Sequence, residues 1–359
     1  VPLLRFPEFT EEWKEHCLAE YLDFKNGLNP SANKFGSGIK FISVMDILNN
    51  NFITYDCIRT SVKITPEEQV AFAVEKGDML FQRSSETLED VGRANVYMDE
   101  NPAVFGGFVI RGKKKTEYNP MFFRYLLASP YARKKIIPMG AGAQHFNIGQ
   151  DGLSKVKLHF PILQEQQKIA ALLRLIDERI TTQNKIIEDL NKLKSAISEC
   201  IFNSIKGDVV MLSEICDIVK GKQINGEYLS ESGEYYVMNG GTEPSGYYSE
   251  YNVKANTISI SEGGNSCGYV QFNNFPFWSG GHCYSLQNIA DIVDNLYLYH
   301  YLKSKEEAIM KLRIGSGLPN IQKKDLAMFK TIVPPFEQQI TISTFLSSLE
   351  RKAEIEERI

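Results

Sequence analysis

The feature that most constrains the fold of this chain is an internal repeat. Residues 18–27 align with 212–221, and residues 145–173 align with 318–346. Two shorter blocks recur between them, 38–47 as 233–241 and Gly106-Gly107 as Gly280-Gly281. The residues that recur in the longest block are Asn147, Ile148, Leu153, Pro161 and Gln166 in the first copy and Asn320, Ile321, Leu326, Pro334 and Gln339 in the second. Four blocks in one order predict two copies of a single module, the second about 20 residues shorter.

Each copy ends in a segment with the apolar spacing of a long helix. Residues 164–206 contain no Pro or Gly, and apolar residues recur every three or four positions until Gly207 stops the pattern. About 43 residues at a rise of 1.5 Å would form a rod of roughly 60 Å. The second segment starts alike at Pro334-Pro335 but reaches only Ile359, so it is expected either to be cut short or to form a shorter helix.

Spacing alone would make these helices a coiled-coil dimer of two chains. The repeat favours another arrangement, in which the two helices of one chain pair antiparallel and relate the two domains by a pseudo-twofold axis.

The parts between the helices have the pattern of short mixed strands, Gly-rich turns and one short helix each. The expected strands are 39–44, 78–82, 105–111, 235–238, 257–261 and 268–272, and the expected helices are 121–127 and 295–303. The predicted fold class is therefore α+β, with two similar globular domains at 1–160 and 207–333 and two long helices at 161–206 and 334–359.

Composition restricts the partners. The formal net charge is −4 and the pI about 5.9, whereas a protein that held DNA alone by neutralising phosphates would usually be basic. Within 107–140, however, eight Lys or Arg residues accompany one acid, Glu117. Any DNA binding is therefore expected to be local and shared with a partner.

Other sequence features point to a reduced, membrane-free compartment. The first residues lack the apolar core of a signal peptide, no stretch approaches the ~20 apolar residues of a membrane helix, and the six cysteines form no C-x-x-C pair. The expected location is the cytoplasm. Cys216, Cys267, His282 and Cys283 could be drawn as a zinc site, but the missing close ligand pair favours scattered buried cysteines and no metal.

The sequence lacks three common catalytic motifs. The chain has no G-x-x-x-x-G-K-[ST] phosphate loop and no readable cluster of metal-chelating carboxylates. Val333-Pro334-Pro335-Phe336 mimics the [DN]-P-P-[FY] motif of amino-methyltransferases, but Val333 cannot accept a hydrogen bond from a target amine. We therefore expect a protein that is not an enzyme.

Several short blocks of the sequence carry a family resemblance: F-P-x-F at 6–9 with Trp13, GLNPS at 27–31, GSGLPNIQKKDL at 315–326, and the helix starts PILQEQQKIA at 161–170 and PPFEQQITI at 334–342. In these blocks the chain resembles the specificity subunits of type I restriction–modification systems. The resemblance spans essentially the whole sequence and its domain order.

The resemblance implies two target-recognition domains, each reading one half of a split, asymmetric site in double-stranded DNA. It implies two methyltransferase subunits that dock on the helices and flip out an adenine for methylation, and two restriction subunits that combine a motor with a nuclease. S-adenosylmethionine, ATP and Mg²⁺ would be held by those partners, and no cofactor by this chain. The short final helix and the acidic second domain depart from the family pattern. A protein-binding or glycan-binding scaffold, suggested by the Tyr- and Gly-rich second domain, is an alternative, as is a nuclease or methyltransferase in its own right.

Candidate DNA-contacting residues come mainly from two loops in equivalent places, 83–93 and 261–270, which hold Ser, Asn, Arg and Gly. The candidates are Lys34, Arg83, Ser84, Ser85, Arg93, Lys113, Lys114, Lys220, Lys222, Asn239, Asn265 and Tyr269. For each of them an ordinary loop or a solvated turn is an equally good interpretation.

Candidate residues for helix packing and partner docking come from the two helix starts. They are Gln166, Ile169, Leu173 and Ile176 in the first copy and Gln339, Ile342 and Leu346 in the second. A packing role alone is an equally good interpretation for each.

Overall fold

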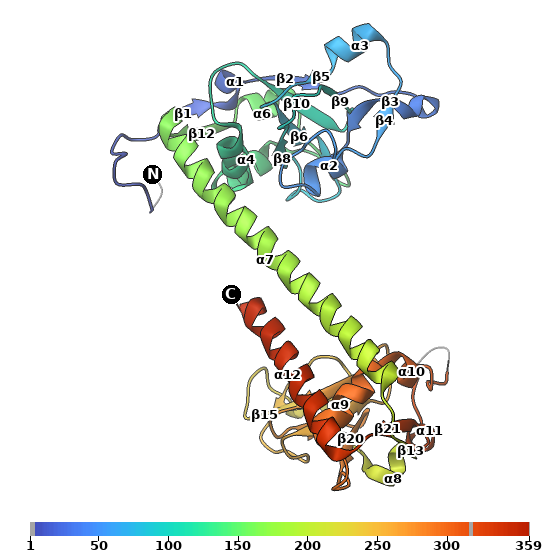
Figure 1. The fold of residues 1–359 in the computed structure, drawn as a ribbon. Helices are drawn as coiled ribbons and strands as arrows, with labels where there is room; N and C mark the ends of the chain where they lie inside the picture. The colour runs from blue at the N-terminus through green and yellow to red at the C-terminus, as the bar shows by residue number, and fades with distance from the viewer. Residues whose placement is uncertain (1–3, 316–318, 359) are drawn as a thin grey trace. The chain divides into compact units, whose positions relative to one another are not determined.

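The computed structural model describes residues 4–315 and 319–358. They form two compact units, Val1–Ile180 and Thr181–Ile359. The boundary falls inside the long helix α7 (Leu163–Ser204), which therefore contributes its first part to one unit and its remainder to the other. Each unit holds one globular domain, which runs from β1 to β12 in the first unit and from β13 to β21 in the second (Figure 1).

The first domain is built on two four-stranded sheets. The central sheet has the order β2 (Leu22–Asn26), β10 (Val109–Lys114), β6 (Met79–Gln82) and β8 (Ala94–Val96), and every neighbouring pair is antiparallel. The second sheet has the order β4 (Ser61–Val62), β3 (Phe35–Ile42), β9 (Ala103–Phe105) and β5 (Ala73–Val74). The entry strand β1 (Lys14–Cys17) pairs with the exit strand β12 (Lys157–Phe160). The helices of this domain are α1 (Leu18–Tyr21), α2 (Val44–Leu48), α3 (Pro66–Ala71), α4 (Pro120–Ala128), α5 (Pro130–Ile136) and α6 (Gln150–Ser154).

The second domain repeats the order of the central sheet with fewer elements around it. Its central sheet is β14 (Asp217–Lys220), β20 (Cys283–Gln287), β17 (Thr257–Ser261) and β18 (Val270–Asn273), again wholly antiparallel. Strand β13 (Asp208–Met211) pairs with β21 (Lys330–Val333), and β15 (Tyr235–Met238) is parallel to β19 (Trp278–Ser279), as β3 is to β9. Strand β16 (Tyr247–Tyr248) completes the smaller sheet, and the helices are α8 (Leu212–Ile215), α9 (Asn295–Ser304), α10 (Glu306–Met310) and α11 (Lys323–Ala327). The shared strand order confirms the repeat and the α+β class.

Two glycines explain why the alignment keeps Gly27 and Gly221. A Cβ atom on Gly27 would lie 2.0 Å from the carbonyl oxygen of Gly106, and one on Gly221 would lie 2.1 Å from that of Gly280. In each domain the residue after the first strand of the central sheet therefore packs against a backbone carbonyl so closely that only glycine fits there. We call this close approach the glycine passage.

One expected strand is wrong as a single element. Residues 105–111 are divided between β9 and β10, because the chain turns at Gly106-Gly107 and the amide of Val109 donates to the carbonyl of Gly106 at 2.8 Å. The expected strands 235–238 and 257–261 are confirmed residue for residue.

The recurring glutamines fasten each long helix to its domain. Gln166 is buried; its amide nitrogen donates to the carbonyl of Pro161 (3.0 Å) and its oxygen accepts from the amide of Asn119 (3.0 Å). Asn119 is the N-cap of α4. Gln339 repeats this with the carbonyl of Pro334 (2.8 Å) and the amide of Asp294 (2.8 Å), the N-cap of α9.

The helix starts pack on the domain that precedes them. Ile169 contacts the first core, and Ile342 and Leu346 belong to the second. Leu173 is half-buried, and Ile176 is 46% exposed. Packing therefore accounts for most of the helix-start candidates, with Ile176 the one that stays open to solvent.

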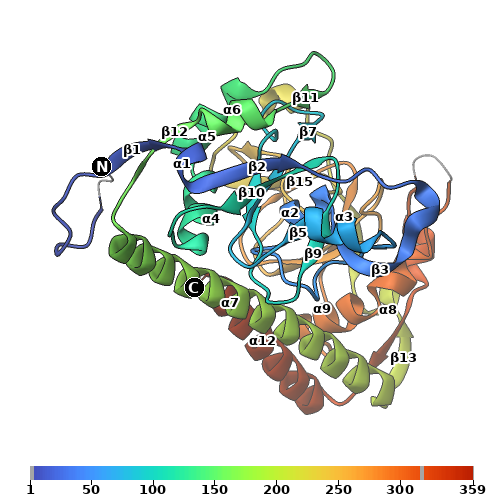
Figure 2. The same ribbon diagram turned by 90° about the horizontal axis from the view of Figure 1, so that it is seen from above.

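Within the second unit, α12 (Phe336–Arg358) runs antiparallel to the later part of α7 (Figures 1 and 2). Near the start of α12, Ile201 of α7 packs on the same core as Ile342. Further along, Lys194 lies 3.5 Å from Glu350, and near its end the amide nitrogen of Gln183 donates to the carbonyl of Glu356 at 2.8 Å. The expected antiparallel pairing is confirmed for this part of α7.

The glycine passage yields a stability prediction. Gly221→Ala should lower the free energy of unfolding of the second unit by about 1–3 kcal/mol, because the added methyl group overlaps a backbone carbonyl. The matched control Gly226→Ala should change it by less than about 0.5 kcal/mol, because a Cβ there meets nothing within 4 Å. Urea unfolding of the two variants measures both values, and equal stability would contradict the close approach.

A pH prediction comes from His300 of α9, which is buried with its Nε2 2.9 Å from Ser347 Oγ of α12. Burial, assisted by Lys194, lowers the pKa of His300 from 6.5 to about 4. Between pH 6.5 and 4 the imidazole is protonated in the unfolded chain but neutral in the folded chain. The free energy of unfolding is therefore unaffected above pH 6.5 and falls by about 3 kcal/mol as the pH drops to 4. Calorimetric unfolding of His300→Gln should show a flatter pH dependence, and the exposed-site control His145→Gln should not.

Candidate nucleic-acid interface

The predicted loops 83–93 and 261–270 are closed in the same way. In the first domain, the amide of Gln82 donates to the carbonyl of Arg93 and the amide of Gly92 to that of Gln82. In the second, Ser261 makes the matching pair of hydrogen bonds with Tyr269 and Gly268. Both loops follow the third strand of the central sheet and lead to the fourth, as expected.

Backbone hydrogen bonds also place the residue that directly follows β6 or β17, Arg83 or Glu262, identically in the two domains. The amide of Arg83 donates to the carbonyl of Phe108 (2.8 Å), and its carbonyl accepts from the amide of Ile148 (2.9 Å). The amide of Glu262 donates to His282 (2.9 Å), and its carbonyl accepts from Ile321 (2.8 Å). We call this position, with its backbone partners, the sheet corner. It holds Arg83 beside Phe108 in one domain and Glu262 beside His282 in the other.

The corner of the first domain presents donors without an acid among them. The Arg83 guanidinium donates to the carbonyl of Gly107 at 3.3 Å, and no carboxylate oxygen of residues 4–315 or 319–358 lies within 4.0 Å of it. Ser84 and Ser85 form β7, which pairs with β11 (Phe146–Asn147), and the Ser84 hydroxyl bonds to the side chain of Asn147. A half-buried Arg with unused N–H groups beside two hydroxyls suits hydrogen bonding to base edges.

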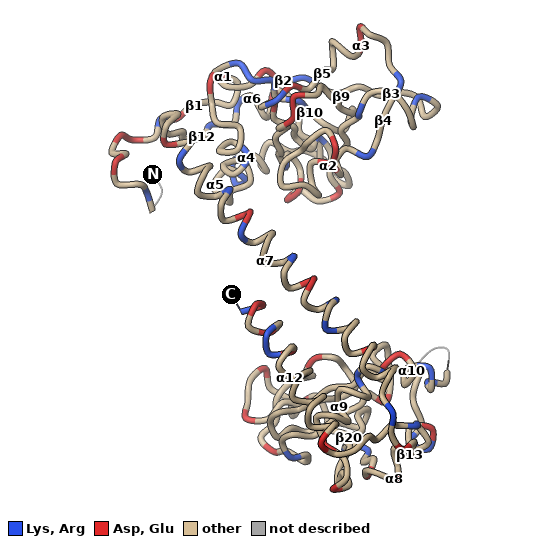
Figure 3. Tube along the Cα trace, in the orientation of Figure 1, with Lys and Arg blue, Asp and Glu red and all other residues tan. Residues whose placement is uncertain are grey.

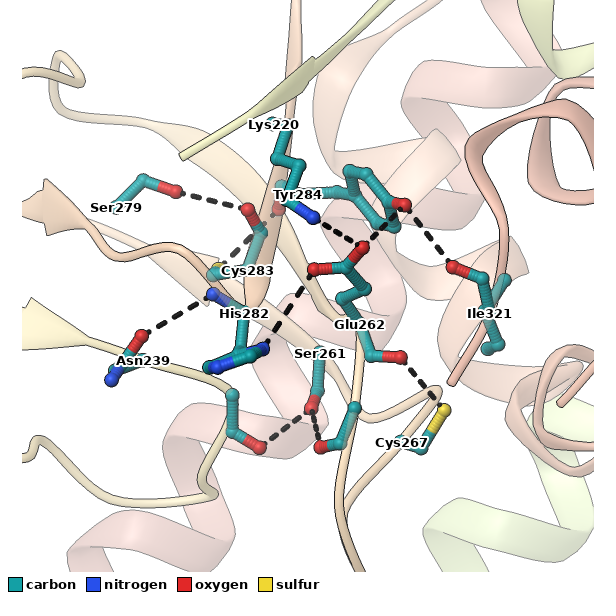
Figure 4. A network of polar contacts seen from close by, with 12 residues as sticks. Lys220, Asn239, Ser261, Glu262, Cys267, Ser279, His282, Cys283, Tyr284 and Ile321 are labelled. Carbon is teal, nitrogen blue, oxygen red and sulfur yellow. Dashed lines mark hydrogen bonds and ion pairs between the residues drawn. The ribbon is translucent and has the colours of Figure 1, made fainter. Parts of the chain in front are cut away.

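The corner of the second domain is a polar network around Glu262 (Figure 4). Its Oε1 accepts from Lys220 Nζ at 2.7 Å and from the Tyr284 hydroxyl at 3.0 Å. Burial, and then the neighbouring carboxylate, raises the pKa of Tyr284, so this hydroxyl remains a donor. The other oxygen, Oε2, is buried without a hydrogen bond and lies 4.0 Å from His282 Nδ1.

The end of β15 joins the same network. The side-chain oxygen of Asn239 accepts from the amide of His282 at 3.3 Å, and the Ser261 hydroxyl donates to the carbonyl of Gly240 at 2.6 Å. Gly240 has φ +88°, and a Cβ there would lie 2.8 Å from the carbonyl oxygen of His282. Lys220, Asn239, His282 and the start of the predicted loop therefore come together from four separate segments.

Other candidates of the first domain lie elsewhere. Lys113 and Lys114 are at the far end of β10 from Arg83, and each is within reach of an acid, Glu75 at 3.3 Å and Glu117 at 2.9 Å. Arg93 closes its loop and pairs with Asp90 at 2.6 Å. Lys34 ends a 3₁₀ turn before β3.

The remaining candidates of the second domain are also divided. Lys222 follows β14, and its carbonyl accepts from the Trp278 indole at 2.9 Å. Asn265 is exposed on the loop. Tyr269 has Lys303 of α9 3.9 Å above its ring, so its face is already covered. The DNA contacts of these residues remain predictions. In the second domain, Lys220 and Asn239 are the candidates that lie at the sheet corner.

Sequence reasoning did not predict Glu262 as a site residue, because cations and amides are the usual partners of DNA, and it named His282 only as a possible zinc ligand. The aligned loops did hold a signal, since one begins with an Arg and the other has an acid at the matching place. No cluster of three or more potential metal ligands occurs in the described part of the chain, and the suggested ligand Cys267 instead lies 3.0 Å from the carbonyl of Glu262.

Charge is mixed along both units, where Lys and Arg alternate with Asp and Glu along the trace (Figure 3). Among the described residues, no helix is both long and apolar enough to span a membrane.

Comparison with known proteins places this architecture. A protein of Methanocaldococcus jannaschii named as the specificity subunit of type I restriction enzyme MjaX is 24% identical, over 98% of this chain and 90% of its own length. The MjaVIII specificity subunit of the same organism is 22% identical, over 99% and 89%. The crystal structure of a type I restriction–modification S subunit from M. genitalium has the same fold, with a TM-score of 0.68, 18% identity and coverage of 96% and 91%. The family model of the type I restriction modification DNA specificity domain matches twice, at residues 10–192 and 206–359. The chain therefore belongs to the family of type I restriction–modification DNA specificity subunits.

Proposed function

We propose that this chain is the non-catalytic subunit that reads a bipartite, asymmetric DNA site for a type I restriction–modification complex. The observation that carries the proposal is the sheet corner, where one backbone geometry presents different chemistry in the two domains. Arg83 and Ser84 stand at the first corner, and Glu262, Lys220 and His282 at the second. Two domains of one fold with different polar groups at one place suit two different half-sites.

The reading would occur mainly through base edges. An Arg matches the O6 and N7 acceptors of guanine, and fixed polar groups at a strand end can reach a groove where the four base pairs differ. Phosphate contacts position a protein but do not select a sequence. Because the net charge of this chain is −4, we assign a large share of those contacts to partner subunits.

The partners in this proposal are two methyltransferase subunits and two restriction subunits. They would hold S-adenosylmethionine, ATP and Mg²⁺ and carry out adenine methylation or cleavage, while this chain supplies only sequence recognition. Several apolar side chains on the first part of α7, among them Leu172, Leu175 and Ile176, are exposed. We assign them to contact with such a partner.

Co-expression with the neighbouring methyltransferase gene, followed by methylome sequencing, tests the function. We expect adenine methylation at one split sequence, with two unlike halves separated by a constant number of unspecified bases. Failure to co-purify with the methyltransferase and the absence of any split methylated sequence would together contradict the proposal.

A second prediction concerns the first corner alone. Arg83→Met should lower the discrimination at one base pair of one half-site by about 1–3 kcal/mol, because it removes hydrogen-bond donors that no carboxylate of the described residues engages. The other half-site should be unchanged, and so should both halves in the control Lys157→Met, an exposed lysine on β12. Methylome sequencing of each variant gives the answer, and equal damage to both halves would count against modular reading.

A further inference from the structure

The second sheet corner contains a buried acid next to two exposed basic side chains. The Glu262 side chain is 11% exposed, whereas those of Lys220 and His282 are 55% and 63% exposed. All three lie at the end of the central sheet, at the ends of β14 and β17 and before β20 (Figure 4).

The fold itself does not require an acid here. The first domain makes the same backbone hydrogen bonds with Arg83 at this position, so either charge is compatible with the strand ends. A buried carboxylate with one oxygen lacking a hydrogen bond is also unfavourable for stability. The presence of Glu262 is therefore best explained by its effect on the neighbouring side chains of Lys220 and His282.

Its clearest effect is on Lys220. A free lysine is a mobile cation on four rotatable bonds, suited to a phosphate as a point charge. Held 2.7 Å from a buried carboxylate, Lys220 loses that mobility and its charge is largely compensated. The ammonium group has three N–H donors, so two remain for an acceptor in a fixed place. A compensated, fixed donor suits a base edge better than a phosphate.

We infer that Glu262 is a positioning residue that sets the base preference of the second domain at one base pair, by holding Lys220 against the acceptor edge of a guanine. His282 Nδ1 lies 4.0 Å from the second carboxylate oxygen. The inference rests on the proposed function and adds to it the residue pair and the kind of base contacted.

The test uses the full chain with its methyltransferase partner and compares Glu262→Gln and Lys220→Met with the wild type. The control is Lys330→Met, an exposed lysine on β21 of the same domain. Methylome sequencing gives the base preference, and DNA binding of the complex at several salt concentrations gives the slope of log K against log salt. Calorimetric unfolding checks that Glu262→Gln still folds. Lys220→Met removes the same Lys220–Glu262 contact by changing the exposed partner, whose replacement disturbs the fold less.

Both variants should lose preference at the same single base pair of the second half-site, by roughly 5- to 150-fold. The first half-site, the salt slope and the control should match the wild type. An unchanged second half-site in Lys220→Met would overturn the inference while leaving the proposed function intact. A salt slope lowered by about 0.9, with affinity lost equally for all sequences, would assign Lys220 to a phosphate and also overturn it. A wild type without a split methylated site would instead refute the proposed function.

Discussion

Two backbone hydrogen bonds at the end of the central sheet are the constraint on which the recognition scheme depends. They fix residue 83 in one domain and residue 262 in the other between the same neighbouring segments. Since these bonds use only backbone atoms, they place no demand on the side chain. The position can therefore hold an Arg in one copy and a Glu in the other without a change of fold, which allows one module to acquire two chemistries.

Other paired contacts fix the strands and helices of each domain in the same way. The glycine passages at Gly27 and Gly221 bring the first strand against the turn that leads into β10 or β20. The buried Gln166 and Gln339 connect the long helices to the caps of α4 and α9. A reading surface set on strand ends, with neighbours fixed in this way, is more precisely positioned than one on free loops.

The sequence predicted the architecture well because a repeat and helical spacing are properties of the whole chain. The two domains followed from aligned blocks, and the equivalence of the loops from their place between strands. The long helices, expected at 161–206 and 334–359 from apolar spacing, are found at 163–204 and 336–358. The prediction of one strand at 105–111 was wrong, because the Gly106-Gly107 turn lies inside an apolar run and does not interrupt the apolar pattern from which a strand is predicted. The site was predicted less well. Lys113 and Lys114 were grouped with Arg83 by charge, but antiparallel pairing puts them at opposite ends of β10. Glu262 was missed because its role depends on Lys220, 42 residues earlier, which only the sheet brings near.

The central claim is that each domain carries its own half of the specificity. It is tested most directly by replacing residues 14–160 with a second copy of residues 208–333 and sequencing the methylome of cells that express this chain with its methyltransferase partner. The account predicts a split site whose two halves have the same sequence, that of the former second half. Methylation that retains the original first half-site would contradict it.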